Sequence, residues 1–258
     1  MSILIDSHTH LDHFPPNELP DVIHRAQNAN VGVIIIAGTT LQSSRRCVEL
    51  ATKYPLLYAG IGLHPMNLEG YLRDDVYHDL MTLGQGSSKV VCISEVGLDF
   101  LPTSPDKNIQ FQALRRQIGL ARELGKPIIF HSRESHKEVF QTLRDERASD
   151  VGGVMHYFQG DVNDAHEAIS LGFSISFAKP LIHSPDLQEI ATTVPLDSIV
   201  LETDSAPQPW KKHRRNWTEP FQLPEIANKL ASLKGMPVEE IINQTTNNIT
   251  RILRLNQT

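Results

Sequence analysis

The chain has little cysteine and no long apolar run. Its 258 residues include two cysteines, Cys47 and Cys92, which are too few for a disulfide framework and are better interpreted as small buried apolar residues. Nowhere do about eighteen apolar residues run together, and the N-terminal sequence MSILIDSHTH has no basic region followed by an apolar stretch. We therefore expect a protein of the reducing cytoplasm without a membrane-spanning or export segment.

Excess positive charge and the common cofactor-binding loops are also missing. A formal net charge of −6 argues against binding nucleic acid through the whole surface, although a local basic patch can still bind phosphates. There is no GxxxxGK[ST] loop and no dinucleotide fingerprint, so ATP and NAD chemistry are disfavoured. There is no GxSxG elbow, and the two cysteines lie away from strand ends, so no serine or cysteine nucleophile is expected. Nothing in the sequence indicates an obligate protein partner.

The chain does contain a regular alternation of short apolar runs and helical segments. Eight runs predict strands, at residues 3–6, 33–37, 57–63, 89–96, 128–131, 153–156, 173–177 and 198–202. Continuous apolar runs of this kind are typical of buried parallel strands. Eight such strands with helices between them predict one (β/α)8 TIM-barrel domain over residues 1–258.

Serine-proline pairs and a glycine mark several predicted helix ends. Ser104 and Pro105 are expected to open one helix, and Gly125 to close it. Ser184 and Pro185 open another in the same way. Two helical segments, 219–234 and 237–253, follow the last strand, so the barrel is expected to end in a pair of helices.

Residue types that bind metals stand at or just past the predicted strand ends. They are His8, His10, Glu95, His131, His156 and Asp204. In a (β/α)8 barrel the C-terminal ends of the strands face one mouth, so four imidazoles and two carboxylates converge there. Each histidine taken alone is more often an ordinary hydrogen-bonded residue, but their equivalent positions favour ligation. The cluster predicts a site for one or two divalent cations.

The two carboxylates in this set are the candidate catalytic residues. Glu95 has two oxygens and can bridge two cations, whereas its alternative role is to cap a loop. Asp204 can hold one metal and also accept a proton from an attacking water. Asp6 and Asp99 are expected to orient ligands or fill the barrel floor, and Glu202 to point away from the site.

Six motifs in order resemble the TatD family of metal-dependent hydrolases. They are HTH after the first strand, GLHP at 62–65, EVGLD at 95–99, HSRES at 131–135, HYFQG at 156–160 and ETDS at 202–205. The resemblance covers about residues 5–220 and implies an amidohydrolase-type barrel, up to two divalent metals and DNase activity that is often exonucleolytic. It assigns one metal to His8, His10, Glu95 and Asp204, and the other to Glu95, His131 and His156.

The chain differs from the best-studied nucleases of this family at positions that are expected to determine the substrate. Tyr157 and Gln159 stand where those enzymes read roughly HCFTG, and APQPWKKHRRNWTEP replaces the usual apolar stretch after ETDS. The sequence is closer to a less characterised branch known simply as metal-dependent hydrolases. The prediction of a metal centre is therefore stronger than the prediction of DNA as substrate.

Three groups of residues are candidates for substrate binding. The resemblance suggests that His64 hydrogen-bonds a phosphate or a leaving group, whereas its alternative role is to pack under the loop. Arg133 can present a guanidinium fork to a phosphate or form a salt bridge at a helix start. The basic run of Lys211, Lys212, Arg214 and Arg215 is expected over the metal mouth, where Trp210 or Trp217 can stack on a base, unless it is a solvated loop.

These observations predict a hydrolase that uses a metal-activated water, with one or two cations such as Zn, Mn or Mg. The expected substrate is DNA or a small phosphodiester. Because water activated in this way also attacks carbonyl carbon, a small-molecule amidase, esterase or deacylase is the alternative. A non-catalytic barrel with structural metal ranks far lower, since structural zinc sites are usually closed and rich in cysteine.

Overall fold

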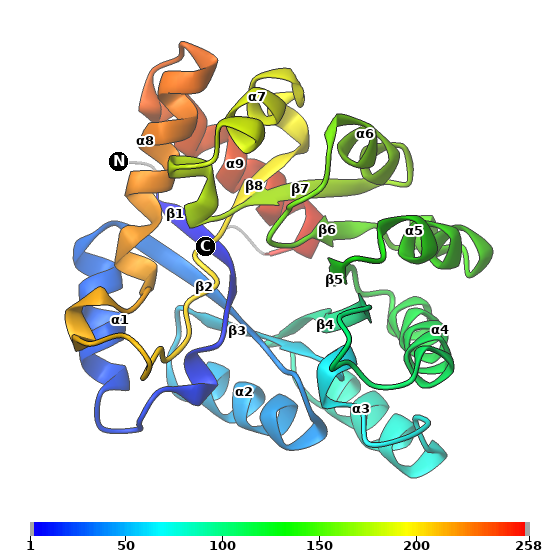
Figure 1. Cartoon of the computed structure of the whole chain (residues 1–258). Coiled ribbons are helices and arrows are strands. Elements are labelled where there is room, and N and C mark those ends of the chain that lie inside the picture. Colours follow the sequence, from blue (N-terminus) through cyan, green and yellow to red (C-terminus); the bar gives the residue numbers. More distant parts are fainter. Residues whose placement is uncertain (1–2, 256–258) are drawn as a thin grey trace.

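The computed structural model describes residues 3–255 and forms one eight-stranded sheet wrapped into a barrel (Figure 1). Its strands are β1 (Leu4–Thr9), β2 (Val31–Ala37), β3 (Leu57–Ile61), β4 (Val90–Asp99), β5 (Ile128–Arg133), β6 (Gly153–Met155), β7 (Phe173–Phe177) and β8 (Ile199–Leu201). Sheet order follows chain order, and neighbouring strands are parallel. A bridge between Thr9 and Ser205 joins β1 to the segment after β8. The predicted (β/α)8 barrel is confirmed.

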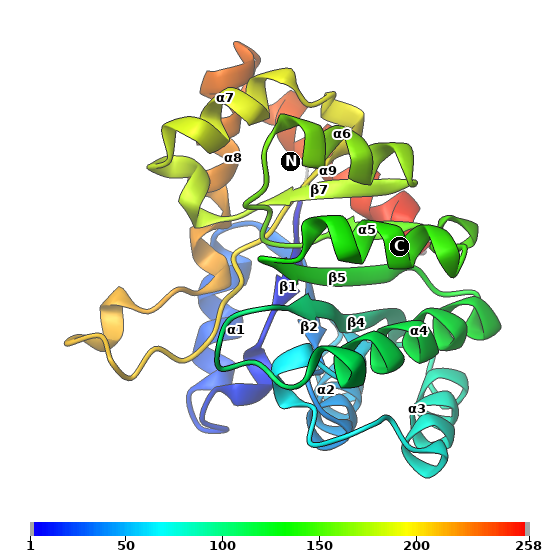
Figure 2. The same cartoon turned by 45° about the vertical axis from the view of Figure 1, so that its right-hand side comes forward.

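Helices surround the sheet on the outside (Figures 1 and 2). They are α1 (Leu19–Asn28), α2 (Leu41–Lys53), α3 (Asp74–Gly86), α4 (Lys107–Leu124), α5 (His136–Asp145), α6 (Val162–Ser170), α7 (Pro185–Thr193), α8 (Leu223–Lys234) and α9 (Val238–Leu253). The predicted pair after the last strand is α8 and α9. In α9, Ile249 and Leu253 lie one turn apart and pack against Ile5 of β1 and Val200 of β8. This helix therefore covers the seam at which the barrel closes.

Burial on both faces explains why the strands read as continuous apolar runs. All ten residues of β4 are buried, as are all those of β1, β6, β7 and β8. Cys47 and Cys92 are buried free thiols, as predicted, and burial raises the pKa of Cys92 to about 12. None of the helices within residues 3–255 is both long and apolar enough to cross a membrane.

One predicted helix start is wrong and another is confirmed. Helix α4 begins after Asp106, whose side chain accepts the backbone N–H of Asn108, and not after Ser104. The Ser104 hydroxyl instead donates to Asp99 at 2.7 Å. Helix α7 starts as expected, with Ser184 as N-cap and Pro185 in the first position.

Candidate metal centre

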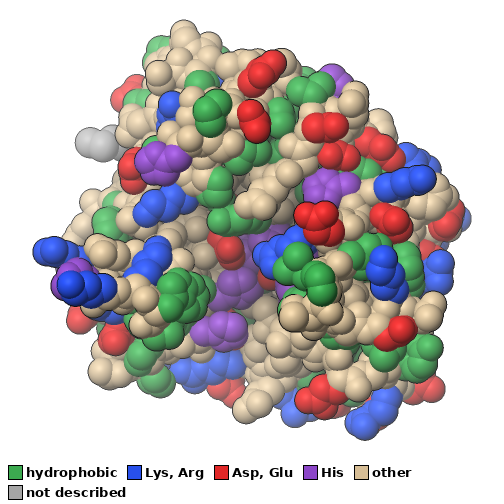
Figure 3. Space-filling view, viewed as in Figure 1, with side chains coloured by type: hydrophobic (Ala, Val, Ile, Leu, Met, Phe, Trp, Pro, Cys, Tyr) green, Lys and Arg blue, Asp and Glu red, His purple; other side chains and the backbone are tan. Residues whose placement is uncertain are grey.

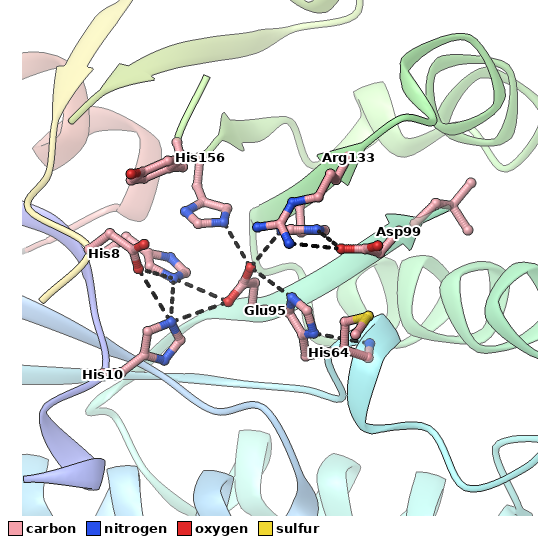
Figure 4. Close-up of polar contacts among 12 residues, drawn as sticks. His8, His10, His64, Glu95, Asp99, Arg133 and His156 are labelled. Atoms are coloured by element: carbon pink, nitrogen blue, oxygen red, sulfur yellow. Dashed lines mark hydrogen bonds and ion pairs between the residues drawn. The ribbon is translucent and has the colours of Figure 1, made fainter. Parts of the chain in front are cut away.

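All six predicted metal ligands lie together at the C-terminal mouth of the barrel, and Figure 4 labels four of them, His8, His10, Glu95 and His156. The set comprises His8 in β1, His10 just after it, Glu95 in β4, His131 in β5, His156 just after β6 and Asp204 just after β8. Glu95 lies at the centre. Its Oε2 is 3.4 Å from Nε2 of His8 and 3.4 Å from Nε2 of His10. Its Oε1 is 2.8 Å from Nε2 of His156 and 3.1 Å from Nδ1 of His131.

The family resemblance groups the ligands into two sets that share Glu95, and a ligand atom of His156 also lies within 4.8 Å of those of His8 and Asp204. The first ligand set is His8, His10, Asp204 and Glu95 Oε2, and the second ligand set is His131, His156 and Glu95 Oε1. In the first set, Oδ1 of Asp204 lies 3.4 Å from Nε2 of His10 and 4.0 Å from that of His8. Metal–ligand bonds of about 2.0–2.2 Å place neighbouring ligand atoms roughly 3.0–3.5 Å apart. The distances from the imidazoles to Glu95 lie near this range, whereas Asp204 and His8 are 4.0 Å apart. The donor atoms around Glu95 are therefore close to the spacing that a divalent cation requires.

Buried charge at the centre is balanced between Glu95 and the imidazoles. Burial alone raises the pKa of the Glu95 carboxyl, but the surrounding histidines outweigh it and hold that pKa well below its usual range. Burial lowers the pKa of His10 and of His156, but their carboxylate partners reverse the shift, so both pKa values are well above the usual range. Without a cation the site therefore holds protons, and a metal has to displace them.

Two further carboxylates hold the histidines of the second ligand set. Asp99 Oδ2 lies 2.9 Å from Nε2 of His131, which leaves Nδ1 of that ring for a metal. Glu202 Oε1 lies 3.2 Å from Nδ1 of His156, and Nε2 of that ring faces Glu95. This contact fits the expectation that Asp99 orients a ligand. The expectation that Glu202 points away is wrong, because its buried carboxylate contacts the ring of His156.

Glu202 is fixed in that position by two other hydrogen bonds. Its Oε1 accepts the backbone N–H of Tyr157 at 2.7 Å, and its Oε2 accepts the Ser176 hydroxyl at 2.6 Å. Both sequence neighbours of this carboxylate are apolar or small, and strand alternation alone gives no sign of the contact. The informative signal is the ETDS motif itself, which carries two acidic residues at one strand end.

The backbone at two positions is adapted to the centre. Gly97 follows Glu95 with φ of 150°, and a Cβ there would lie 1.9 Å from the carbonyl oxygen of His131. Glycine therefore allows β4 and β5 to approach closely where each carries a ligand. Asp204 adopts a left-handed φ of 50°, and Asp6 accepts the backbone N–H of the preceding Thr203 at 2.9 Å. Asp6 thus orders the chain beside Asp204, and its carboxyl also has a hydrogen bond with the backbone of His8.

His64 lies beside the second ligand set with a defined tautomer. Its Nδ1 accepts the backbone N–H of Met66 at 3.1 Å, and burial lowers its pKa. A neutral imidazole whose Nδ1 accepts carries its proton on Nε2. That Nε2 lies 3.2 Å from Glu95 Oε1, so His64 is placed to donate a hydrogen bond there. The contact with Met66 favours a donor over a metal ligand at this position.

Two cavities meet over the ligands, and histidines gather near the middle of this face (Figure 3). One, of about 410 Å³, extends past Arg133, Tyr157 and Trp210, and the other, of about 620 Å³, extends towards α2 and Arg46. Both include His10, His64 and Glu95 in their walls. The half-exposed Arg133 also lies 3.5 Å from Asp99, so it combines access to the cavity with a salt bridge. The ligand centre therefore opens to molecules on two sides.

The basic run after β8 is only partly where it was predicted. Arg214 is paired with Glu18 and Glu219, both at 2.7 Å, and with Arg215 it lines a cavity that shares no residue with the two at the centre. The prediction that these two arginines face the metal mouth is wrong, because Glu18 from a distant part of the chain and the nearby Glu219 engage Arg214. Lys211 donates to the carbonyl of Asn216 within the loop, and Lys212 is exposed.

Comparisons with known proteins agree with this architecture. The family described as TatD-related DNase matches residues 5–254. The uncharacterised metal-dependent hydrolase YabD of Bacillus subtilis is 34% identical over 262 residues, covering 98% of this chain and 100% of that protein. Human deoxyribonuclease TATDN3 is 31% identical over 263 residues, covering 96% of this chain and 94% of its own.

A solved structure with the same architecture is that of the TatD homologue YJJV from Escherichia coli K12. It superposes with a TM-score of 0.87 at 29% sequence identity and covers 98% of both chains. An uncharacterised amidohydrolase of Saccharomyces cerevisiae shares the fold with a TM-score of 0.80 at 16% identity over 98% of this chain and 100% of its own.

Proposed function

Because the chain belongs to the TatD-related DNase family of metal-dependent hydrolases, we propose that it cleaves phosphodiester bonds of DNA. The observation that carries the proposal is Glu95, whose two carboxylate oxygens each lie among the donor atoms of a different ligand set. Divalent cations held by these ligands would lower the pKa of water and stabilise negative charge on the scissile group. The name of the human relative, a deoxyribonuclease, supports the choice of substrate.

Asp204 is the proposed general base. Burial raises its pKa, but the hydrogen bond and charge of His10 outweigh it, so the pKa lies below the usual range and the carboxylate is ionised at neutral pH. Its side chain is 29% exposed, whereas that of Glu95 is 4% exposed. Asp204 is therefore the carboxylate of the pair that water can reach, and it can take a proton from the attacking water.

The remaining side chains at the mouth are proposed to bind the phosphate. The one N–H of His64 is on Nε2 and faces Glu95 Oε1; if cations bound that carboxylate, the N–H would become available to a phosphate oxygen or the leaving oxygen. Arg133 lines the same cavity and presents a charged fork there. Lys211 and Lys212 are not among the residues that line either cavity at the ligands, and their proposed role is to neutralise flanking phosphates.

An activity comparison tests the bond class. Protein stripped by a chelator and reloaded with Mn²⁺, Zn²⁺ or Mg²⁺ is incubated with single-stranded and duplex DNA and, separately, with chromogenic amides and esters. We expect cleavage of DNA that chelation abolishes and metal restores. Full activity in excess chelator contradicts the metal-dependent reaction. If an amide or ester is hydrolysed and DNA is not cleaved, the proposed nuclease function is wrong and the small-molecule hydrolase is supported.

A further inference from the structure

The two tryptophans of the chain lie in one loop and have opposite environments. Trp217 is half-buried, packs edge-on against Phe14 with ring centroids 6.0 Å apart, and lies under the guanidinium of Arg214 at 4.3 Å. Trp210 is 75% exposed, more than any other large hydrophobic residue among those described. Trp217 therefore anchors the loop to the barrel, while Trp210 contributes little to packing.

The chain around Trp210 is nevertheless held in place. The side-chain oxygen of Gln208 accepts the backbone N–H of Thr218 at 2.9 Å, and the backbone N–H of Lys211 donates to the Gln208 carbonyl at 2.9 Å. The ion pairs of Arg214 fix the other end of the loop. Figure 2 shows this loop projecting away from the barrel after β8. The exposed ring is thus presented from a braced segment and is not a side chain on an untethered tail.

Trp210 lines the same cavity as the catalytic carboxylates. The walls of that 410 Å³ cavity include Glu95, Asp204, Arg133 and Tyr157 together with Trp210. A flat apolar ring and a guanidinium on one cavity match the two parts of a nucleotide, because aromatic rings stack on bases and arginine pairs with phosphate. The other cavity at the centre has histidine as its only ring-bearing wall residue.

We propose that Trp210 is a stacking platform for a nucleobase adjacent to the scissile phosphate, so that the enzyme prefers a single-stranded or frayed segment over an intact duplex. In a duplex the faces of each base are covered by its neighbours, and a protein ring can stack only on a base that has left the stack. The inference rests on the proposed nuclease function and adds to it the strandedness of the substrate and the residue that selects it.

The two-tryptophan composition gives a direct binding test. In a metal-loaded protein carrying Trp217→Phe and Asp204→Asn, Trp210 is the sole tryptophan and turnover is suppressed. We expect a single-stranded oligothymidylate to quench its fluorescence, and a strand of equal length and charge made of abasic nucleotides to leave it nearly unchanged. Equal quenching by both strands would show that Trp210 responds to charge or to loop position, and would contradict its role in stacking on a base.

Kinetics supply a second test that does not depend on substituting Trp217. Trp210→Ala should raise KM for a single-stranded oligonucleotide by roughly 5- to 150-fold, the range expected for one base stacked on an aromatic ring. Trp210→Phe, which keeps a ring, should recover much of this loss. Tyr71→Ala is the matched control, because Tyr71 is 60% exposed but lines a different cavity, and it should leave KM unchanged.

The result with duplex DNA completes the design. Blunt duplex should be cleaved more slowly than single strand by the wild type, and the difference should shrink in Trp210→Ala. If wild-type protein cleaves DNA and Trp210→Ala cleaves single strand equally well, the platform is refuted and the nuclease function stands. If wild-type protein cleaves no nucleic acid with any of the metals, the nuclease function itself is refuted. Hydrolysis of the amides or esters would then identify the protein as a small-molecule hydrolase.

Discussion

The histidines of the second ligand set are each backed by a carboxylate, whereas those of the first set are not. Asp99 holds His131 and Glu202 holds His156. In the first set, Nδ1 of His8 and Nδ1 of His10 are buried, and no hydrogen-bond partner is found for them among residues 3–255. Carboxylates behind ligating imidazoles fix the tautomer and orientation and make the ligand more basic. The second set is therefore arranged for a cation before one binds.

The first set is ordered by other means. His8 and His10 are two residues apart at the end of β1, which turns both imidazoles to the same side. His8 also stacks on His156, with ring centroids 4.0 Å apart. These contacts restrict the rings less than a hydrogen bond does. We infer that the affinity of the first set for a cation comes mainly from its anionic ligands, Glu95 and Asp204. The affinity of the second set should depend less on any single ligand.

The shared carboxylate should have the largest effect. Glu95→Gln removes charge from both ligand sets at once, so metal content measured by elemental analysis should fall in both. Turnover should fall by more than about 10²-fold, the upper end for a residue that merely supports a ligand. Circular dichroism and thermal unfolding of the variant serve as the control for folding. If Glu95→Gln keeps the full metal content of the wild type, the assignment of Glu95 as a bridging ligand is contradicted.

Asp204→Asn separates the two sets. It removes the proposed base and the anionic ligand of the first set only, so turnover should fall by about 10²-fold or more while the cation of the second set is retained. Metal content and single-turnover rates measured on the same preparation distinguish the two losses. Turnover close to that of the wild type would withdraw the assignment of Asp204 as base.

The carboxylates behind the second set should have a smaller and more selective effect. Asp99→Asn and Glu202→Gln should each weaken one cation by roughly 10- to 100-fold, as removal of such a partner usually does. Isothermal titration of metal-free protein should then show one weakened site and one unchanged site. If both sites weaken equally, the two sets act as one unit and the comparison between them fails.

Much of this arrangement is predictable from the sequence because it follows from strand ends. Each ligand closes or follows an apolar run, and the parallel barrel brings such ends to one mouth, so the convergence of His8, His131 and Asp204 needs no knowledge of side-chain packing. Bounds of the longer strands were less accurate. The run ending at 96 continues to Asp99 as β4, since polar residues that line a site interrupt the apolar pattern without ending the strand.

The unpredicted contacts are those that depend on partners distant in the chain. Arg214 pairs with Glu18, which lies at the opposite end of the sequence, so local charge density gave no hint that the guanidinium is occupied. Glu202 lies beyond the end of β8, where the alternation of strand side chains no longer applies. Ser104 and Asp106 are both good caps by type, and the tertiary contact of Ser104 with Asp99 decides between them.

The smallest expected effect is the pH dependence of stability, and it has opposite signs with and without metal. In metal-free protein the raised pKa values of His10, His131 and His156 contribute stability below pH ~6.5 that is lost as pH rises through the folded values. The lowered pKa values of His8 and His64 oppose this in part. We expect the metal-free protein to unfold at a lower temperature near pH ~8.5 than near pH ~6.

Metal should reverse that trend, because a cation binds deprotonated imidazole and competes with the protons that stabilise the metal-free site. The rise in Tm on adding a fixed excess of Zn²⁺ or Mn²⁺ should therefore be larger near pH ~8 than near pH ~6, and 1 kcal/mol corresponds to about 2–4 °C for a chain of this size. Asp99→Asn sharpens the comparison between the two sets, since it removes the partner that raises the pKa of His131. In that variant, protons should compete less strongly with the cation for the histidines of the second set, whereas their competition at the first set should be unchanged. An increment in Tm that is the same at both pH values would contradict ligation by these histidines, whichever set binds the cation first.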